Sequence, residues 1–147
     1  LELLDGIIDI YMPDMKYADP DVGMMFSKVP DYPERNQAAV REMHRQVGDL
    51  VLDDEGIAQH GLLVRHLVLP DGMAGTEEIV RFLVEEISPD TYINVMGQYR
   101  PMWKAQGREL SPLDRPVTHQ EVVRAQAIAG GAGLRLDERR TWIQSFL

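Results

Sequence analysis

Polar side chains that could bind a small ligand interrupt or follow three apolar segments of the sequence. They are Asp14 and Lys16 after the first segment, Arg65 within the second, and Asn94, Gln98 and Tyr99 in or after the third. Lysine and arginine can hold a carboxylate, whereas aspartate can hold an ammonium group, a hydroxyl or a cation. This set of side chains suits a small anionic or zwitterionic ligand.

These residues can share one site if the three segments are parallel strands. The segments Ile7–Met12, 61–69 and 91–96 are short, apolar and rich in β-branched residues, which is typical of buried strands. A short final strand is expected at 133–136.

Helices are expected between these strands. The first runs from Glu34 to about Gly48, with Pro33 in its first turn, and the second follows Thr76 as N-cap. The third begins at the capping box Thr118-x-x-Glu121. We expect residues 17–33 to form a loop with at most one helical turn, and residues 97–117 to form a long loop.

Strands that alternate with helices predict an α/β fold with about three to four parallel strands and flanking helices. Two architectures remain open, a partial (β/α) barrel and an open flavodoxin-like sheet. In both, ligands bind at the carboxyl ends of the strands. We interpret residues 1–138 as one domain and residues 139–147 as a C-terminal tail.

The composition excludes several function classes. The chain has 147 residues, no cysteine and a formal net charge of −9. It therefore has no disulfide, no thiol nucleophile and no thiolate for an iron–sulfur cluster. The negative charge disfavours binding to nucleic acids or anionic membranes. No apolar run is long enough to span a bilayer, and we take the cytoplasm as the default location.

Each candidate also has a purely structural interpretation. Asp14 and Lys16 could form a surface ion pair, and Arg65 could lie on a solvated face. Asn94 could satisfy a backbone group, and Tyr99 could be a packing aromatic. His66 is expected to be structural, and His60 is too far from it along a strand to share a metal ion.

Four stretches together resemble a known family. They are Tyr11–Tyr17 with its Asp-x-Lys, Met43–Gly48, Gly61–Pro70 and Tyr92–Pro101, in that order. This combination resembles an uncharacterised branch of the radical S-adenosylmethionine (SAM) proteins related to pyruvate formate-lyase activating enzymes. The resemblance runs from about Leu3 to Leu136, and it implies the C-terminal half of that family's barrel.

The resemblance also implies a ligand site. Asp14, Met15 and Lys16 would face the amino-acid part of SAM, and Asp14 could also help to bind a metal cation. Arg65 would be a second polar contact, Leu67 would lie near the adenine, and Asn94, Gln98 and Tyr99 would complete the site. The Gln98–Arg100 region replaces a family segment with a ribose-binding histidine. The family's [4Fe–4S] cluster is held by a C-x-x-x-C-x-x-C motif that this chain lacks, so no catalytic residue is assigned and the chain alone is expected to be inactive. SAM and the cluster are expected in the longer parent protein, and neither is expected to be resident in this chain alone.

Three functions remain open. In a radical SAM protein, the longer enzyme would cleave SAM reductively and abstract hydrogen from a substrate, such as a glycine of a glycyl radical enzyme. A Schiff-base lyase would use Lys16 as nucleophile and Asp14 as proton shuttle. A non-catalytic module would serve in binding or assembly and would catalyse no reaction. The chain begins at Leu1 as if cut from something longer. We expect self-association through the exposed strand Ile7–Met12 or through the open inner face of the half-barrel, or else coverage by the apolar tail Trp142–Leu147.

Overall fold

A mainly parallel sheet forms the centre of the protein. The computed structural model describes residues 1–107 and 110–137, and the predicted tail 139–147 lies outside them. The sheet follows the order β1-β4-β5-β6, and β2 and β3 also pair with β4. The strands are β1 (Ile10–Tyr11), β2 (Asp14–Met15), β3 (Val51–Leu52), β4 (Ala58–Leu67), β5 (Tyr92–Met96) and β6 (Arg135–Leu136). All pairs are parallel except the one between β3 and β4.

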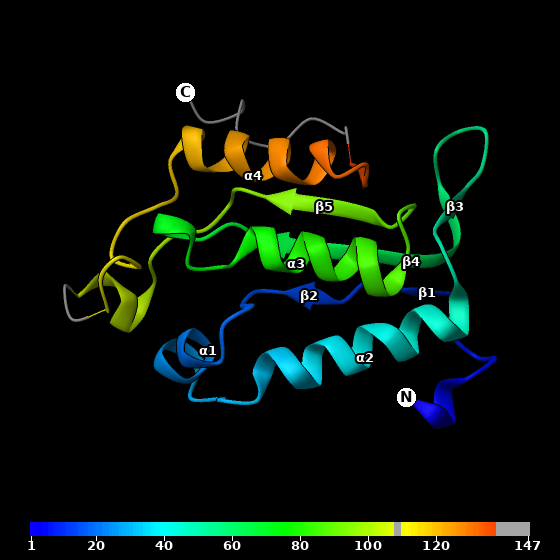
Figure 1. Cartoon of the computed structure of the whole chain (residues 1–147), viewed down its shortest axis with the longest axis horizontal. Helices are drawn as coiled ribbons and strands as arrows, with labels where there is room; N and C mark the ends of the chain where they lie inside the picture. The colour runs from blue at the N-terminus through cyan, green and yellow to red at the C-terminus, as the bar shows by residue number, and fades with distance from the viewer. Residues whose placement is uncertain (108–109, 138–147) are drawn as a thin grey trace.

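Helices connect the strands (Figure 1). They are α1 (Pro20–Ser27), α2 (Tyr32–Val47), α3 (Thr76–Phe82) and α4 (His119–Gly131). A π-helical turn, η3 (Leu83–Ile87), continues α3. In the described residues, 3₁₀ turns also lie at η1 (Glu2–Leu4), η2 (Pro70–Gly72) and η4 (Trp103–Gln106). The described part of the chain is therefore a mixed α/β structure with helices flanking a parallel sheet.

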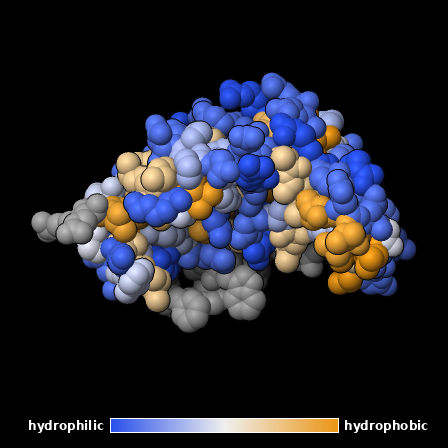
Figure 2. Space-filling model, turned by 90° about the horizontal axis from the view of Figure 1, so that it is seen from below, coloured by the Kyte–Doolittle hydropathy of each residue, from blue (hydrophilic) through white to orange (hydrophobic). Residues whose placement is uncertain are grey.

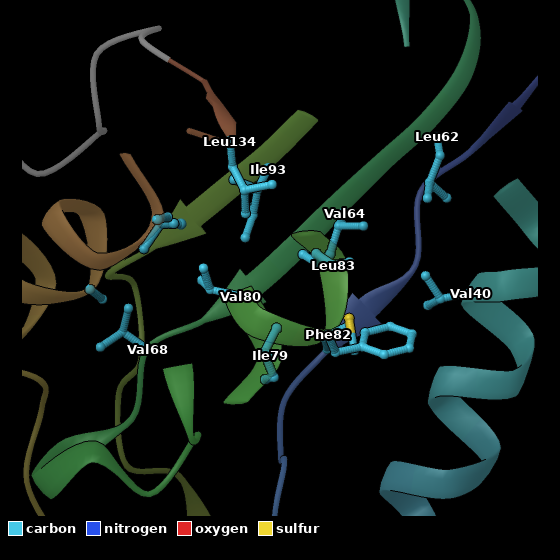
Figure 3. Close-up of a cluster of buried hydrophobic side chains, with 14 of the residues drawn as sticks. Val40, Leu62, Val64, Val68, Ile79, Val80, Phe82, Leu83, Ile93 and Leu134 are labelled. Carbon is cyan, nitrogen blue, oxygen red and sulfur yellow. The ribbon is translucent and has the colours of Figure 1, made fainter. Parts of the chain in front are cut away.

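The main helices cover one face of the sheet. In β4 and β5 the side chains that face the helices are buried, whereas their neighbours on the other face are mostly half-buried. The buried core between sheet and helices includes Val64 and Ile93 from the strands, Val40 from α2 and Ile79 from α3 (Figure 3). Strand order follows chain order along β1-β4-β5-β6, and right-handed crossovers of constant direction place all connecting helices on one side.

The sheet therefore lacks the order reversal of a doubly wound fold in its described strands. That finding disfavours the flavodoxin-like alternative, which places helices on both faces. We call the face without these helices the open face; it carries Leu63, Arg65, Leu67, Asn94 and Met96, which are all half-buried.

Several predicted boundaries were wrong. The first strand was expected over Ile7–Met12, but only Ile10–Tyr11 of that run forms a strand, β1. A second short strand, β2, follows Pro13, which has no N–H to donate within a ladder. Both strands keep the same register on β4, with Ile10 opposite Gly61 and Asp14 opposite Arg65. Asp14 therefore lies inside the strand and not after its end.

Two helices also differ from expectation. The 17–33 segment contains the eight-residue helix α1, whose N-cap Asp19 accepts a hydrogen bond from the Asp21 N–H and whose first turn holds Pro20. Helix α3 begins at Thr76 with Gly75 as its N-cap, so Thr76 does not cap it. By contrast, α2 ends before Gly48 and α4 begins with the complete Thr118–Glu121 capping box, as predicted.

Among residues 1–107 and 110–137, the helices are all too short or too polar to cross a lipid bilayer.

Candidate functional site

Three predicted site residues lie in one row across the open face. Asp14 of β2 is the register partner of Arg65 on β4, and Arg65 is the register partner of Asn94 on β5. Residues directly opposite each other on neighbouring strands point to the same side of a sheet. Lys16 follows Asp14 by two residues and shares that side. The topology thus brings four of the predicted residues together.

Asp14 is the centre of an ion-pair cluster. The Arg65 side chain donates to Oδ1 of Asp14 from Nε and lies 2.6 Å from it at Nη2. Lys16 Nζ lies 3.3 Å from Oδ2 of the same carboxylate. The three side chains are 28% (Asp14), 37% (Arg65) and 43% (Lys16) exposed, so water reaches all of them. Two cations around one anion leave a net charge of about +1, which favours an incoming carboxylate.

The backbone that carries Asp14 and Lys16 is held from the helix side. The Tyr32 hydroxyl accepts from the Lys16 N–H at 3.1 Å and donates to the Asp14 carbonyl oxygen at 3.3 Å. The Asn36 side-chain amide donates to the same carbonyl oxygen at 3.0 Å. Burial raises the pKa of the Tyr32 phenol, so its hydroxyl keeps the proton that it donates. Neither residue was predicted from the sequence as part of the site, although their i, i+4 spacing at the start of α2 could have indicated a shared helix face.

His66 supports the same segment from the buried face. It is 0% exposed, its Nδ1 lies 2.9 Å from the carbonyl oxygen of Met15, and its Nε2 lies 2.9 Å from the hydroxyl of Thr76. Burial lowers the pKa of this imidazole, so the ring is neutral. Nδ1 then donates to Met15 and Nε2 accepts from Thr76. His66 thus joins β2 to the start of α3 and has no access to solvent.

The other predicted contacts lie in three different places. Met15 is 2% exposed and its side chain packs in the helix-covered core, so it faces away from Asp14 and Lys16. A ligand on the open face would not meet that side chain, so a contact of Met15 with such a ligand would have to come from its backbone. Leu67 and Tyr99 pack in a second apolar cluster with Tyr17 and Leu113 at the carboxyl ends of the strands. Gln98 is exposed and its side-chain amide reaches the sulfur of Met96 at 3.8 Å.

Tyr99 closes this edge through its hydroxyl, which donates to the Leu113 carbonyl oxygen at 2.7 Å. Burial raises the pKa of the Tyr99 phenol. The tyrosine therefore joins two parts of the loop between β5 and α4, and its hydroxyl already has a hydrogen-bond acceptor.

Two clefts lie beside this site and not at it. One, of about 560 Å³, lies between η2, the start of α3 and α4, and the other, of about 530 Å³, lies between the start of α1 and η2. Carboxylates line both, including Asp71 and Glu78. The polar cluster on the open face is instead a shallow, partly exposed surface of the sheet.

The Asp14 carboxylate has both oxygens engaged by cationic side chains. Within residues 1–107 and 110–137, no group of three or more histidine, cysteine or acidic side chains is arranged to hold a metal ion. A cation at Asp14 would have to displace Lys16 or Arg65 from the carboxylate, and it would need further oxygen ligands besides Asp14.

Comparison with known proteins gives one relative. The chain is 31% identical over 130 residues to the uncharacterized protein MJ0674 of Methanocaldococcus jannaschii, and the match covers 88% of this chain and 33% of the relative. The chain thus spans about a third of the length of the curated relative that it matches. No family model and no solved structure matches the chain.

Proposed function

We propose that this chain is the C-terminal half of a (β/α) barrel of the radical SAM type, and that its open face binds the amino-acid end of S-adenosylmethionine. The observation that carries the proposal is the Asp14–Lys16–Arg65 cluster on the sheet face that α2, α3 and α4 leave uncovered. In a (β/α) barrel that face lines the interior, and the ligand sits toward the carboxyl ends of the strands.

The chemistry of the cluster fits a zwitterionic amino acid. Lys16 and Arg65 offer N–H donors to a carboxylate, and Asp14 offers an acceptor to an ammonium group. Asn94 adds an amide next to Arg65 in the sheet register. Leu67 and Met96, in register with each other on the same face, offer an apolar surface to the remainder of the ligand.

The radical reaction would need iron–sulfur cluster ligands that this chain does not have. With no cysteine in its sequence, the chain can supply no thiolate to an iron–sulfur cluster, so those ligands would come from elsewhere in a longer protein. The bound cofactor and the cluster would supply the radical chemistry. We propose hydrogen abstraction from a substrate, such as a glycine in a partner protein, as the activity of that longer protein.

Calorimetric titration of the 147-residue chain with S-adenosylmethionine tests the ligand. We expect SAM added in excess to bind the part of the site that the open face retains, and we expect Arg65→Gln to weaken this binding by about tenfold or more, the cost of one charge-assisted contact. The control is Arg35→Gln, because Arg35 pairs with Asp31 on the surface of α2 and is 75% exposed. Equal affinity in the wild type and in Arg65→Gln would refute the site. Borohydride trapping of a carbonyl compound on Lys16 would instead support a Schiff-base lyase.

A second proposal concerns assembly, and it rests on the exposed apolar residues of the N-terminal segment. Leu3 is 92% exposed and Ile7 is 67% exposed, and Figure 2 shows apolar side chains gathered at this end of the molecule while the surface over α2 is mostly hydrophilic. Strand β1 pairs with β4 along one edge, so its other edge can add a strand. We propose that this edge mediates association of the chain with a second polypeptide or with itself.

Light scattering of the chain at increasing concentration tests the assembly. We expect a dimer or larger species, and we expect Ile10→Lys, at an exposed position of β1, to shift it toward monomer, because a lysine on an edge strand disfavours strand addition. Val123→Lys is the matched control, since Val123 is 46% exposed on α4. A monodisperse monomer at all concentrations would contradict self-association.

A further inference from the structure

The edge of β2 that faces away from β4 has an unusual set of partners. The Arg65 N–H donates to the Pro13 carbonyl oxygen, so that carbonyl faces β4. Because successive carbonyls of a strand point in opposite directions, the carbonyl of Asp14 faces the outer edge, and so does the N–H of Lys16. A further strand would normally pair with these groups.

Side chains from α2 occupy that edge instead. Tyr32 bridges the two groups, accepting from the Lys16 N–H and donating to the Asp14 carbonyl oxygen. The Asn36 amide adds a second donor to the Asp14 carbonyl oxygen. The outer edge of β2 is therefore hydrogen-bonded by two side chains from one face of α2. Tyr32 and Asn36 make no such hydrogen bonds to the backbone of β1.

Asn36 makes this contact at a cost. It lies one helical turn before Val40, a residue that is 0% exposed in the core, so it occupies a position of the inward stripe of α2 where an apolar side chain would pack. Its Oδ1 is buried with no hydrogen-bond partner in the described structure. A flipped amide would set this oxygen against the Asp14 carbonyl oxygen. A buried polar atom left unpaired destabilises a fold and calls for an explanation outside stability.

We propose that Tyr32 and Asn36 are positioning residues, which fix the backbone of Asp14 and Lys16 so that both side chains meet Arg65 on the open face. The inference deepens the proposed SAM site and rests on it for the identity of the ligand. Fixing one carbonyl and one N–H two residues apart sets the peptide planes on both sides of Met15. The directions of the Asp14 and Lys16 side chains follow from those planes.

Asn36→Leu is the variant that separates positioning from stability. Leucine has the same number and branching of side-chain heavy atoms, although its two methyl groups are bulkier than the amide; it removes the orphaned oxygen and continues the apolar stripe. A structural role predicts that the variant loses stability. A positioning role predicts unchanged or raised thermal stability together with about a tenfold weaker affinity for S-adenosylmethionine, the scale seen when residues that orient ligand-binding groups are removed. Tyr32→Phe should act in the same direction, because it removes the bridging hydroxyl and keeps the ring.

Gln37→Leu is the matched control. Gln37 is the next residue of α2, also half-buried, and its side chain makes no hydrogen bond within residues 1–107 and 110–137. It should leave both stability and affinity close to those of the wild type.

Two measurements made without ligand distinguish a failure of the positioning role from a failure of the proposed function. The hydrogen exchange rate of the Lys16 amide should rise in Tyr32→Phe, and the carboxyl carbon signal of Asp14 should shift in both variants, because its geometry with Arg65 changes. If the wild type does not bind S-adenosylmethionine, the proposed function fails, and these two signals still decide the positioning role. Unchanged amide exchange and an unchanged Asp14 signal in both variants would overturn the inference.

Discussion

The two faces of β4 have the same backbone and opposite surroundings. On the helix-covered face Leu62, Val64 and His66 are at most 1% exposed. On the open face Leu63, Arg65 and Leu67 alternate with them and are only half-buried. Successive side chains of a strand point to opposite sides, so the helices bury one set of side chains and leave the other set partly exposed.

This contrast separates stability from ligand binding within one strand. The covered face removes apolar side chains from water, which is the main favourable term in folding. The open face leaves a charged cluster accessible, which adds little to stability but can bind a ligand. Substitutions on the covered face should therefore lower stability, whereas those on the open face should lower affinity.

The largest expected effect is on the covered face of β5. Ile93 is 0% exposed in the main core, so Ile93→Ala should lower the free energy of unfolding by about 2–5 kcal/mol. The next residue, Asn94, lies on the open face, and Asn94→Ala should cost less than about 1 kcal/mol. Urea unfolding followed by circular dichroism measures both. Similar losses for the two variants would show that the open face is covered in solution.

Local signals in the sequence predicted much of the fold. The Thr118-x-x-Glu121 pattern gave the start of α4 because both capping partners lie within one turn. The apolar runs gave β4 and β5, and their alternation with helices gave the parallel sheet. The split of the first strand was not predicted, because Pro13 was read as closing the strand when the register on β4 continues past it.

The candidate site was predictable only where it follows strand topology. Asp14, Lys16 and Arg65 were expected to share one edge because parallel strands end together, and the structure brings them into contact. Tyr32 and Asn36 were not predicted, since their role depends on how α2 packs against β2. Thr76 was read as a helix cap from its position, but its hydroxyl lies at Nε2 of His66, a tertiary contact with no local signal.

The next largest effect concerns His66 on the covered face of β4 and the dependence of stability on pH. Burial lowers the pKa of His66 in the folded chain, while the unfolded chain has the ordinary value near 6.5. As pH falls below about 6.5 the unfolded chain binds a proton that folded His66 does not, so the free energy of unfolding falls. The slope should reach about 1.4 kcal/mol per pH unit for this one group.

Urea unfolding of the wild type between pH 7.5 and 5.5 measures this slope. His66→Gln should remove most of it, although the variant is less stable at every pH because a buried hydrogen-bonded ring is lost. His119→Gln is the control, because His119 is exposed at the start of α4, and it should keep the wild-type slope. A wild-type stability that rises toward pH 5.5 would contradict a neutral, buried His66.

The smallest expected effect on stability belongs to the open face. Asp14→Asn removes the carboxylate that pairs with Arg65 and Lys16 and leaves two cations close together. Because Asp14 is 28% and Arg65 37% exposed, water screens the pair, and the loss in free energy of unfolding should stay below about 1 kcal/mol. The loss should shrink further when salt is raised from about 0.01 M to 1 M, since the Debye length falls from about 30 to 3 Å. A loss of several kcal/mol that does not respond to salt would mean that the pair is desolvated in solution, and the open face would then be part of the core rather than a ligand surface.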